Sequence, residues 1–490
     1  MIHLEIDNVN CVATGASNYH QVTKALETLT PGYQYTWMYK KGMWNGRVNL
    51  MTDETFPAGL VPFVLDIIQR DNIPVTITDN RVCKQIELQP TTVPLRPYQE
   101  EIVNKALFNM FCDTWWPRGV LQVATGGGKT EMAAAMIQRT NVPTLFLVHR
   151  QDLATQALER FAKYKIQAGG LDTAASNLVT VTTIQSLMSW NMTFNKVYTN
   201  VEGEEVERSD EWMEKKRRKQ RKKANNAKAV LDAIEQVFID EAHLVAAKEE
   251  NMNMFSTALA LMPNAYMRWG LTATPFMRDK LHNWMLEGAT GTSIAHITNR
   301  ELIDMGYLSE AFVDMYVMNK NGDIPNDWPR CYEFGIMTNR ERNNKVVDCF
   351  STYAKPALIL VNKLGQGTIL ETKLAQAGFH VPFISGSSTK AERLKAINDL
   401  KTGKLQGVIA STIWDEGIDI SNIETVILAG GGKSEIKNLQ RLGRGLRKAQ
   451  GKANLRLVDF FDPSPRTLKK HSEIRKQLWE SQGFTINILK

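Results

Sequence analysis

Cysteine is scarce in this chain of 490 residues, and long apolar runs are absent. Its five cysteines lie far apart, and none belongs to a CxxC pair: Cys11, Cys83, Cys112, Cys331 and Cys349. This spacing argues against a disulfide framework and against a zinc site. No stretch approaches the roughly 18 uncharged residues of a membrane span, and the first residues lack the basic start of a signal peptide. We therefore expect a cytoplasmic protein with no membrane partner.

Acidic residues are too few to balance the basic ones, because 52 Asp and Glu stand against 59 Lys and Arg, a net charge of +7. One window, residues 213–223 (MEKKRRKQRKK), carries eight basic residues and one acidic residue and so accounts for all of this excess. The rest of the chain is neutral overall. Net charge is thus no independent evidence for a polyanionic partner, and the function must be inferred from sites.

The first 85 residues are predicted to form a small α/β module. Short alternating segments, among them 33–39 and 47–51, are typical of strands, and they accompany two helical stretches. Asn45-Gly46 lies between those two segments, and Asn-Gly is the strongest short signal for a β-hairpin. A proline-punctuated linker follows the module.

From residue 95 onward, buried β runs alternate with helical segments, which predicts an α/β fold with parallel sheets. The pattern restarts near residue 357, so two lobes are expected, at 95–295 and 296–462, with a helical tail at 463–490. Residues 193–234 interrupt the first lobe with an acidic patch, the basic window and an Ala-rich stretch. We expect a projecting helical insertion there, with disorder as the alternative.

The segment 119–130 (GVLQVATGGGKT) predicts a phosphate-binding loop. A buried strand, a glycine-rich turn and a helix beginning at Lys-Thr would let backbone N–H groups surround a phosphate, with Lys129 supplying a charge and Thr130 a magnesium ligand. Val123 occupies the first glycine position of the strict GxxxxGK[ST] pattern, but the shorter TGxGKT variant fits. The candidate nucleotide-binding residues of this loop are Thr125, Gly126, Gly127, Gly128, Lys129 and Thr130.

Two acids, Asp240 and Glu241, follow a predicted buried strand at 237–239 and begin the sequence DEAH. Ligands gather at the carboxyl edge of a parallel sheet. Asp240 would hold magnesium, and Glu241 would accept a proton from the attacking water. Alone, such a pair is usually a helix N-cap, but together with the phosphate loop it predicts a site for nucleoside-triphosphate hydrolysis.

The second lobe contributes QRLGRGLRK, in which arginines at spacing i, i+3 would share one helix face. A guanidinium fork there could neutralise charge on a transferred phosphoryl group. The alternative is a solvated basic face. The candidate residues are Gln440, Arg441, Arg444 and Arg447.

The motif order along residues 95–450 resembles that of superfamily 2 helicases and translocases of the DExH type. LRPYQEEIV resembles the adenine-reading glutamine motif, with Gln99 the matching residue, and LTATP (271–275) resembles the motif that couples nucleotide to nucleic acid. The resemblance implies two tandem RecA-like lobes that use ATP and Mg²⁺. It also implies catalytic roles for Lys129, Asp240, Glu241, Gln440, Arg444 and Arg447, nucleotide proximity for Gly417 and Asp419, and nucleic-acid contacts for Arg150, Thr183, Lys363 and Thr412.

The amino-terminal segment YKKGMWNGRVNLM (39–51) resembles the small domain in front of the motor in phage UvsW-type helicases. The matching residues are Tyr39, Trp44, Gly46 and Arg47. We expect Lys40, Lys41, Trp44 and Arg47 to contact DNA, with phosphates as the main target. The alternative is that Trp44 packs in a small core and Arg47 is solvated.

By this resemblance, the expected function is an ATP-dependent DNA helicase or translocase that unwinds or branch-migrates forks, junctions and R-loops in recombination, replication and repair. The resemblance also implies movement in the 3′ to 5′ direction and binding to branched, duplex and single-stranded DNA. Possible protein partners are single-strand-binding or recombination proteins. The expected oligomeric state is a monomer, and the expected location is the bacterial host cytoplasm if a phage encodes the chain. The rivals are an RNA helicase, the translocase subunit of a restriction system, and a nucleotide-gated DNA-binding switch.

Overall fold

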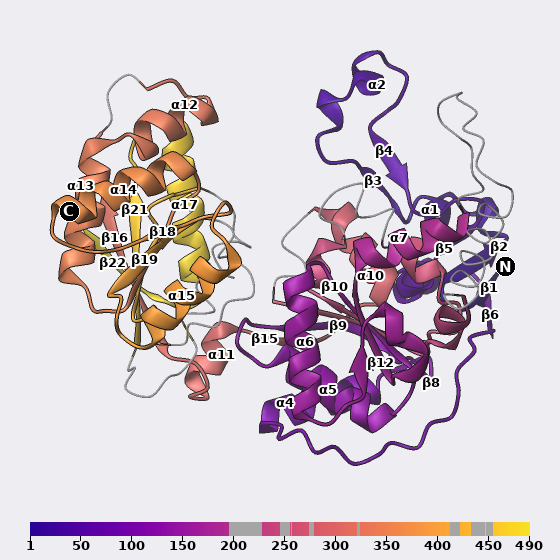
Figure 1. Cartoon of the computed structure of the whole chain (residues 1–490). Coiled ribbons are helices and arrows are strands. Elements are labelled where there is room, and N and C mark those ends of the chain that lie inside the picture. Colours follow the sequence, from indigo (N-terminus) through magenta and orange to yellow (C-terminus); the bar gives the residue numbers. More distant parts are fainter. Residues whose placement is uncertain are drawn as a thin grey trace, which may run out of the picture. The chain divides into compact units, whose positions relative to one another are not determined.

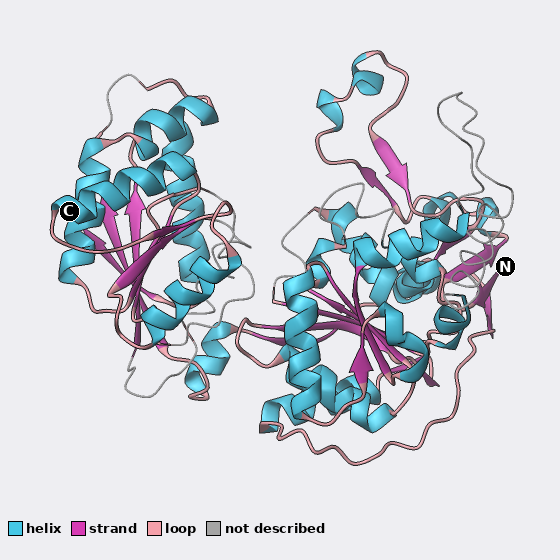
Figure 2. Ribbon diagram, in the orientation of Figure 1, coloured by secondary structure: helices cyan, strands magenta, loops and turns pink. Residues whose placement is uncertain are grey.

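The computed structural model describes residues 1–195, 228–245, 255, 257–273, 279–320, 324–411, 422–432, 446 and 454–490. These residues divide into two compact units (Figures 1 and 2). The first comprises Met1–Val123 and Gly128–His296; the second comprises Ile297–Lys490, with which Ala124–Gly127 is grouped. Within the described residues, no helix is both long enough and apolar enough to cross a membrane.

The first unit is built on a seven-stranded sheet in the order β11-β12-β10-β13-β14-β9-β15. The registered pairs from β11 to β9 are all parallel. All five residues of β10 are buried, as expected for a strand covered on both faces. The strands are β9 (Arg118–Val123), β10 (Thr144–Val148), β11 (Ala168–Gly169), β12 (Val179–Thr183), β13 (Gln236–Asp240), β14 (Met267–Thr272) and β15 (Ser293–Ile297). The helices that cover it include α4 (Pro97–Leu107), α5 (Lys129–Thr140), α6 (Gln151–Lys163), α7 (Ile184–Asn195) and α10 (Lys280–Thr290).

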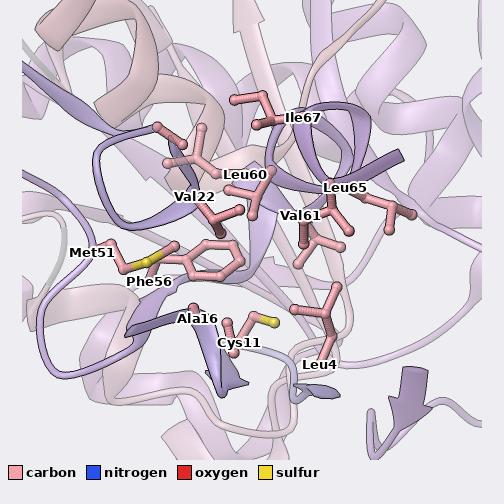
Figure 3. Packing of buried hydrophobic residues seen from close by; sticks show 14 of the residues in the cluster. Leu4, Cys11, Ala16, Val22, Met51, Phe56, Leu60, Val61, Leu65 and Ile67 are labelled. Atoms are coloured by element: carbon pink, nitrogen blue, oxygen red, sulfur yellow. The ribbon is translucent and has the colours of Figure 1, made fainter. Parts of the chain in front are cut away.

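The amino-terminal module has a four-stranded sheet in the order β5-β2-β1-β6, and α3 (Val61–Arg70) packs against it. Figure 3 shows the shared core of strand and helix side chains, with Phe56 at its centre. Trp116 and Trp284, both outside the module, belong to the same buried cluster. The module and the first lobe are therefore joined by a continuous apolar core. The strands are β1 (Ile2–Ile6), β2 (Asn10–Thr14), β5 (Thr55–Pro57) and β6 (Val75–Asp79).

An arm projects from the module (Figure 1). Its base is the antiparallel pair of β3 (Glu27–Leu29) and β4 (Arg47–Asn49), and residues 30–46 form its far end. The strand predicted at 33–39 is wrong, because this segment forms the 3-10 turn η2 (Tyr33–Tyr35) and the short helix α2 (Trp37–Lys40). The tight hairpin predicted at Asn45-Gly46 is also wrong. β4 pairs with β3, and the loop that joins these two strands spans residues 30–46.

The second unit has its own seven-stranded sheet, in the order β18-β19-β17-β20-β21-β16-β22. The registered strand pairs are parallel. Its strands are β16 (Glu310–Val317), β17 (Ala357–Leu360), β18 (Phe383–Ile384), β19 (Gly407–Ala410), β20 (Thr425–Ile427), β21 (Asn454–Phe461) and β22 (Thr485–Leu489). Its helices include α11 (Asn299–Asp304), α12 (Trp328–Tyr332), α13 (Arg340–Thr352), α14 (Leu364–Gln376), α15 (Lys390–Lys401) and α17 (Arg466–Ser481). The two parallel sheets confirm the predicted fold class of tandem RecA-like lobes.

The tail at 463–490 is not a separate helical appendage. It contains α17 and then β22, which pairs in parallel with β16 and so completes the second sheet at its edge. The predicted insertion at 193–234 and the basic window at 213–223 lie mostly outside the described residues. Their predicted helix therefore stays a prediction.

Candidate nucleotide and nucleic-acid sites

The phosphate loop joins β9 to α5, as its sequence predicts. Gly126 (φ 87°) and Gly128 (φ 83°) both adopt left-handed backbone conformations, which residues with a Cβ atom avoid. Gly128 is the N-cap of α5, so Lys129 opens the helix. The Lys129 ammonium donates to the carbonyl oxygen of Val123 at 3.4 Å. A turn of this shape directs N–H groups and a positive charge to one place, where a phosphate can bind.

The glutamine of the adenine-reading motif lies directly against this turn. Gln99 is buried, and its Oε1 accepts a hydrogen bond from the backbone N–H of Arg96 at 2.8 Å. A Cβ atom on Gly128 would lie only 2.2 Å from Gln99 Nε2. The two sequence-predicted residues are thus in close contact, although 29 positions separate them. Nothing other than glycine fits at position 128 without a shift of one of them.

The acidic pair lies at the end of β13, at the carboxyl edge of the sheet. Burial and, to a lesser extent, the neighbouring Glu241 carboxylate raise the pKa of the Asp240 carboxyl to about 6, although the Lys129 ammonium acts in the opposite direction. Glu241 itself adopts a left-handed backbone conformation (φ 49°), which is strained for a residue with a side chain. Strain of this kind is concentrated at functional sites.

The histidine of DEAH connects this site to the next strand. His243 is buried, and its Nδ1 lies 3.1 Å from Thr272 Oγ1 and 3.5 Å from Glu241 Oε2. Thr272 is the last residue of β14 and the second residue of LTATP. A contact network therefore runs from the acidic pair to the motif expected to couple nucleotide and nucleic acid. Residues 274–275 of that motif lie outside the described residues.

The candidate metal ligands at this site, Thr130 and Asp240, are too few to bind a metal ion without further ligands, and they suit Mg²⁺ bound together with a nucleotide. In the part of the chain that the structure describes, no three His, Cys, Asp or Glu side chains are grouped to hold a metal ion. Mg²⁺ in nucleotide sites is usually bound by one or two protein ligands together with substrate phosphates and water. Thr130 at the start of α5 and the half-buried Asp240 fit such a site, and a divalent cation would offset the charge of the Asp240–Glu241 pair.

Several predicted residues of the second lobe lie outside the described residues, so their roles stay predictions. These are Thr412, Gly417, Asp419, Gln440, Arg441, Arg444 and Arg447.

The predicted nucleic-acid contacts occupy helix N-termini. Arg150 is the N-cap of α6 and forms an ion pair with Asp152 at 3.3 Å. Thr183 ends β12, and its hydroxyl accepts from the backbone N–H of Ser186 at 3.1 Å, so it caps α7. Lys363 is the exposed N-cap of α14. All three stay candidates for backbone contacts.

The predicted residues of the amino-terminal module lie on the arm. Lys40 and Lys41 are exposed on α2 and just after it. Trp44 is half-buried, and its Nε1 donates to the carbonyl oxygen of Arg47 at 2.8 Å. The Arg47 guanidinium lies 3.2 Å from Glu27 Oε1. Trp44 and Arg47 thus also hold neighbouring parts of the arm together, and their contacts to DNA stay a prediction.

Two buried arginines of the second unit escaped the sequence analysis. Arg475 in α17 pairs with Asp459 at 3.0 Å, and its Nη1 donates to the carbonyl oxygen of Gly432 at 2.9 Å. Arg342 pairs with Asp462 at 2.5 Å and donates from Nε to the carbonyl oxygen of Ala429 at 3.2 Å. Both therefore hold the turn that follows β20. In the sequence, Arg475 is one of several Lys and Arg residues between positions 466 and 476, a pattern that does not distinguish a buried ion pair from a solvated helix face.

Comparisons with known proteins agree with these motifs. The family model described as "Type III restriction enzyme, res subunit" matches residues 92–277, and the "Helicase conserved C-terminal domain" matches residues 333–449. The chain belongs to the superfamily 2 helicases. The two models match residues in both units, and relatives of the chain carry helicase names.

Relatives of similar architecture include the DNA 3′-5′ translocase XPB2 of Sulfurisphaera tokodaii, 25% identical over 74% of this chain and 81% of that protein. The ATP-dependent DNA helicase UvsW of Enterobacteria phage T4 is 20% identical over 91% of this chain and 87% of its own length. A protein named helicase 22 of a Sulfolobus islandicus filamentous virus is 29% identical over 50% of this chain, but the match spans only 45% of that relative.

Among solved structures, the ATP-dependent Type ISP restriction-modification enzyme LlaBIII bound to DNA has a TM-score of 0.57. It is 14% identical, and the match covers 82% of this chain and 31% of that one. At this identity the likeness concerns the fold alone.

Proposed function

We propose that this chain is an ATP-dependent DNA helicase or translocase of the DExH type. It would unwind or branch-migrate forks, junctions and R-loops in recombination, replication and repair. One observation carries the motor assignment: the glycine turn, Gln99, Lys129 and the half-buried Asp240–Glu241 pair lie at one end of a single parallel sheet. The names of two long-matching relatives, a DNA translocase and a DNA helicase, support DNA as the polymer.

The residues of the first lobe divide the work of hydrolysis. Gln99 would contact the base, while the N–H groups of the glycine turn and the Lys129 ammonium would hold the phosphates. Thr130 and Asp240 would hold Mg²⁺, which supplies charge neutralisation at the phosphoryl group when bound. The Glu241 carboxylate would accept the proton of the attacking water. Gln440, Arg444 and Arg447 would supply the charge from the second lobe.

The nucleic-acid backbone would lie along Arg150, Thr183, Lys363 and Thr412, and the lysines of the arm would contact phosphates. Movement would be 3′ to 5′, as the name of the translocase relative suggests. Possible partners are single-strand-binding or recombination proteins, and the working form would be a monomer.

A second candidate function rests on the first family match, which carries the description of a restriction-enzyme subunit. In that case the chain would be the translocating part of a restriction system and would need a nuclease partner. It would then consume ATP on long duplex DNA and show little preference for branched DNA.

The test is ATP hydrolysis by the purified chain without nucleic acid and with single-stranded DNA, duplex DNA, a four-way junction or single-stranded RNA. We expect the strongest stimulation by branched DNA, and loss of hydrolysis in Glu241→Gln because the base is removed. Equal or greater stimulation by RNA would overturn the DNA assignment. Stimulation by long duplex alone would favour the restriction candidate.

A further inference from the structure

The far end of the arm exposes large apolar side chains, which a soluble surface seldom gathers in one place. Tyr35 is 76% exposed, Trp37 64% and Met43 64%. Met38, at 50%, lies beside them on α2, and we call these four side chains the apolar tip. The module's own core, which contains Phe56 and Leu60, does not include them. Figure 1 shows that this part of the arm stands clear of the first unit's sheets.

The apolar tip is held on a braced scaffold. The rings of Tyr33 and Tyr39 meet edge to face at 4.7 Å between centroids, and Thr36 caps α2 by accepting from the N–H of Tyr39 at 3.3 Å. Gly46 (φ 78°) lies so close to Tyr33 that a Cβ atom would be 2.4 Å from its ring. The contact between Tyr33 and Tyr39 thus fixes the loop, whereas Tyr35 and Trp37 are the more exposed aromatic residues.

The charge around the apolar tip has one sign. Residues 30–46 contain two lysines, Lys40 and Lys41, and no Asp or Glu. Both lysines are exposed and follow the apolar side chains directly along α2. Outward aromatic rings beside cations, without acids, are the combination that binds single-stranded nucleic acid: the rings stack on bases and the cations meet phosphates.

We propose that the apolar tip is a stacking platform for unpaired nucleobases at the point where a duplex opens. Trp37 and Tyr35 stack on the first unpaired bases, Met38 and Met43 widen the contact, and Lys40 and Lys41 hold the adjoining phosphates. The inference rests on the proposed function, because it requires that the chain binds DNA. It adds a base-contacting site at a distance from the phosphate loop and assigns the arm to the branch point.

The test measures the affinity of the full chain for a DNA fork with two single-stranded arms and for a blunt duplex of equal length, by fluorescence anisotropy without nucleotide. Trp37→Ala should weaken fork binding at least about fivefold, the lower end of what one stacked base contributes. Affinity for the blunt duplex should stay within about twofold, and Trp37→Phe should restore most of the loss. A 2-aminopurine at the first unpaired position should be quenched by wild type and not by Trp37→Ala.

Two controls separate stacking from charge and from folding. Lys40→Ala/Lys41→Ala should lower the slope of log affinity against log salt for the fork by up to about 1.4, the value for two phosphates of a single strand, whereas Trp37→Ala should leave that slope unchanged. Phe108→Ala removes an equally exposed ring (63%) at the end of α4 and should change nothing. All variants should keep the thermal midpoint of wild type, which shows that they fold.

The outcomes distinguish this inference from the proposed function. If wild type binds no DNA at all, the proposed function fails. If wild type binds the fork and Trp37→Ala binds it equally well, the stacking platform alone is overturned, and the apolar tip belongs to a protein or to a second copy of the chain. An equal loss of affinity for the fork and for the blunt duplex in Trp37→Ala would also overturn it. A blunt duplex has no unpaired bases, so the loss of a stacking contact cannot weaken its binding.

Discussion

The contact between the glycine turn and Gln99 leads to a quantitative prediction for Gly128→Ala. Two costs arise at this position. The left-handed backbone (φ 83°) costs about 1–2 kcal/mol once a Cβ atom is present. The new Cβ atom would also lie 2.2 Å from Gln99 Nε2, so that side chain must move. Its movement releases the 2.8 Å hydrogen bond from the Arg96 N–H, worth about 0.5–1.5 kcal/mol.

The consequence for ATP follows from the second cost. If the turn keeps its shape only by displacing Gln99, ATP loses its contact with the Gln99 side chain and the preformed arrangement of Gln99 against the glycine turn. The binding free energy of ATP should then weaken by about 1–2 kcal/mol. We therefore expect KM for ATP to rise about 5- to 30-fold, since about 1.4 kcal/mol corresponds to a factor of ten. The free energy of unfolding should fall by about 1.5–3.5 kcal/mol in total.

Steady-state ATP hydrolysis and urea unfolding measure the two effects, and the chain offers matched controls. Gly378 has nearly the same φ, 86°, but nothing lies within 4 Å of its Cβ position. Gly378→Ala should lose about 1–2 kcal/mol of stability from backbone strain and leave KM unchanged. Gly170→Ala, with open space and no positive φ, should change neither quantity.

A double variant tests the collision itself. Removing the amide in Gln99→Ala raises KM, but adding Gly128→Ala on top should then cost less than it does in wild type, because the clashing group is absent. Strictly additive effects on KM would refute the argument that Gln99 and Gly128 act through contact.

Two further predictions concern stability. Arg475→Ala leaves the buried Asp459 carboxylate without its cationic partner and should lower the free energy of unfolding in urea by about 3–5 kcal/mol. The control Lys476→Ala removes an exposed ion pair and should change this free energy by no more than about 0.5 kcal/mol. Equal effects of the two substitutions would show that the Arg475–Asp459 pair does not stabilise the fold. Burial raises the pKa of Glu287 to about 7, so the folded state binds this proton more tightly than the unfolded state, and stability should fall as pH rises from 4.5 towards 7. Glu287→Gln should therefore be about 2–3 kcal/mol more stable than wild type at pH 8 and close to it at pH 5, and a pH-independent difference would contradict the buried carboxyl.

The central strands of both sheets could be predicted because they are buried on both faces and read as short apolar runs. β10 is the clearest case, with every residue buried. The edge strand β22 (TINIL) carries no such signal, since none of its residues is buried and Thr485, Asn487 and Ile488 are exposed. Its place depends on pairing with β16, a contact between segments more than 160 residues apart.

The arm shows where residue preferences mislead. Residues 33–39 are rich in Tyr, Thr and Trp, which favour strands. Here the aromatic residues do not line a sheet. Tyr33 and Tyr39 pack on each other inside a loop, while Tyr35 and Trp37 point outward. No local pattern distinguishes these two uses of an aromatic residue.

The candidate site was more accessible from sequence than the fold around it. Phosphate and Mg²⁺ chemistry requires particular residues at short spacing, so the turn before Lys129 and the pair Asp240–Glu241 are visible in the sequence. The partners that hold these residues, such as Thr272 for His243, come from distant strands. Arg475 illustrates the limit, because its partner Asp459 lies 16 residues away and only the folded sheet brings them together.

Movement of DNA strands by the chain can be measured directly on a labelled fork and a labelled four-way junction, by gel electrophoresis or energy transfer. We predict strand separation or branch migration that requires ATP hydrolysis, proceeds on DNA, and is abolished by Glu241→Gln although that variant still binds the DNA. ATP hydrolysis stimulated by DNA without any movement of strands would contradict it, and movement on RNA but not on DNA would contradict the choice of polymer.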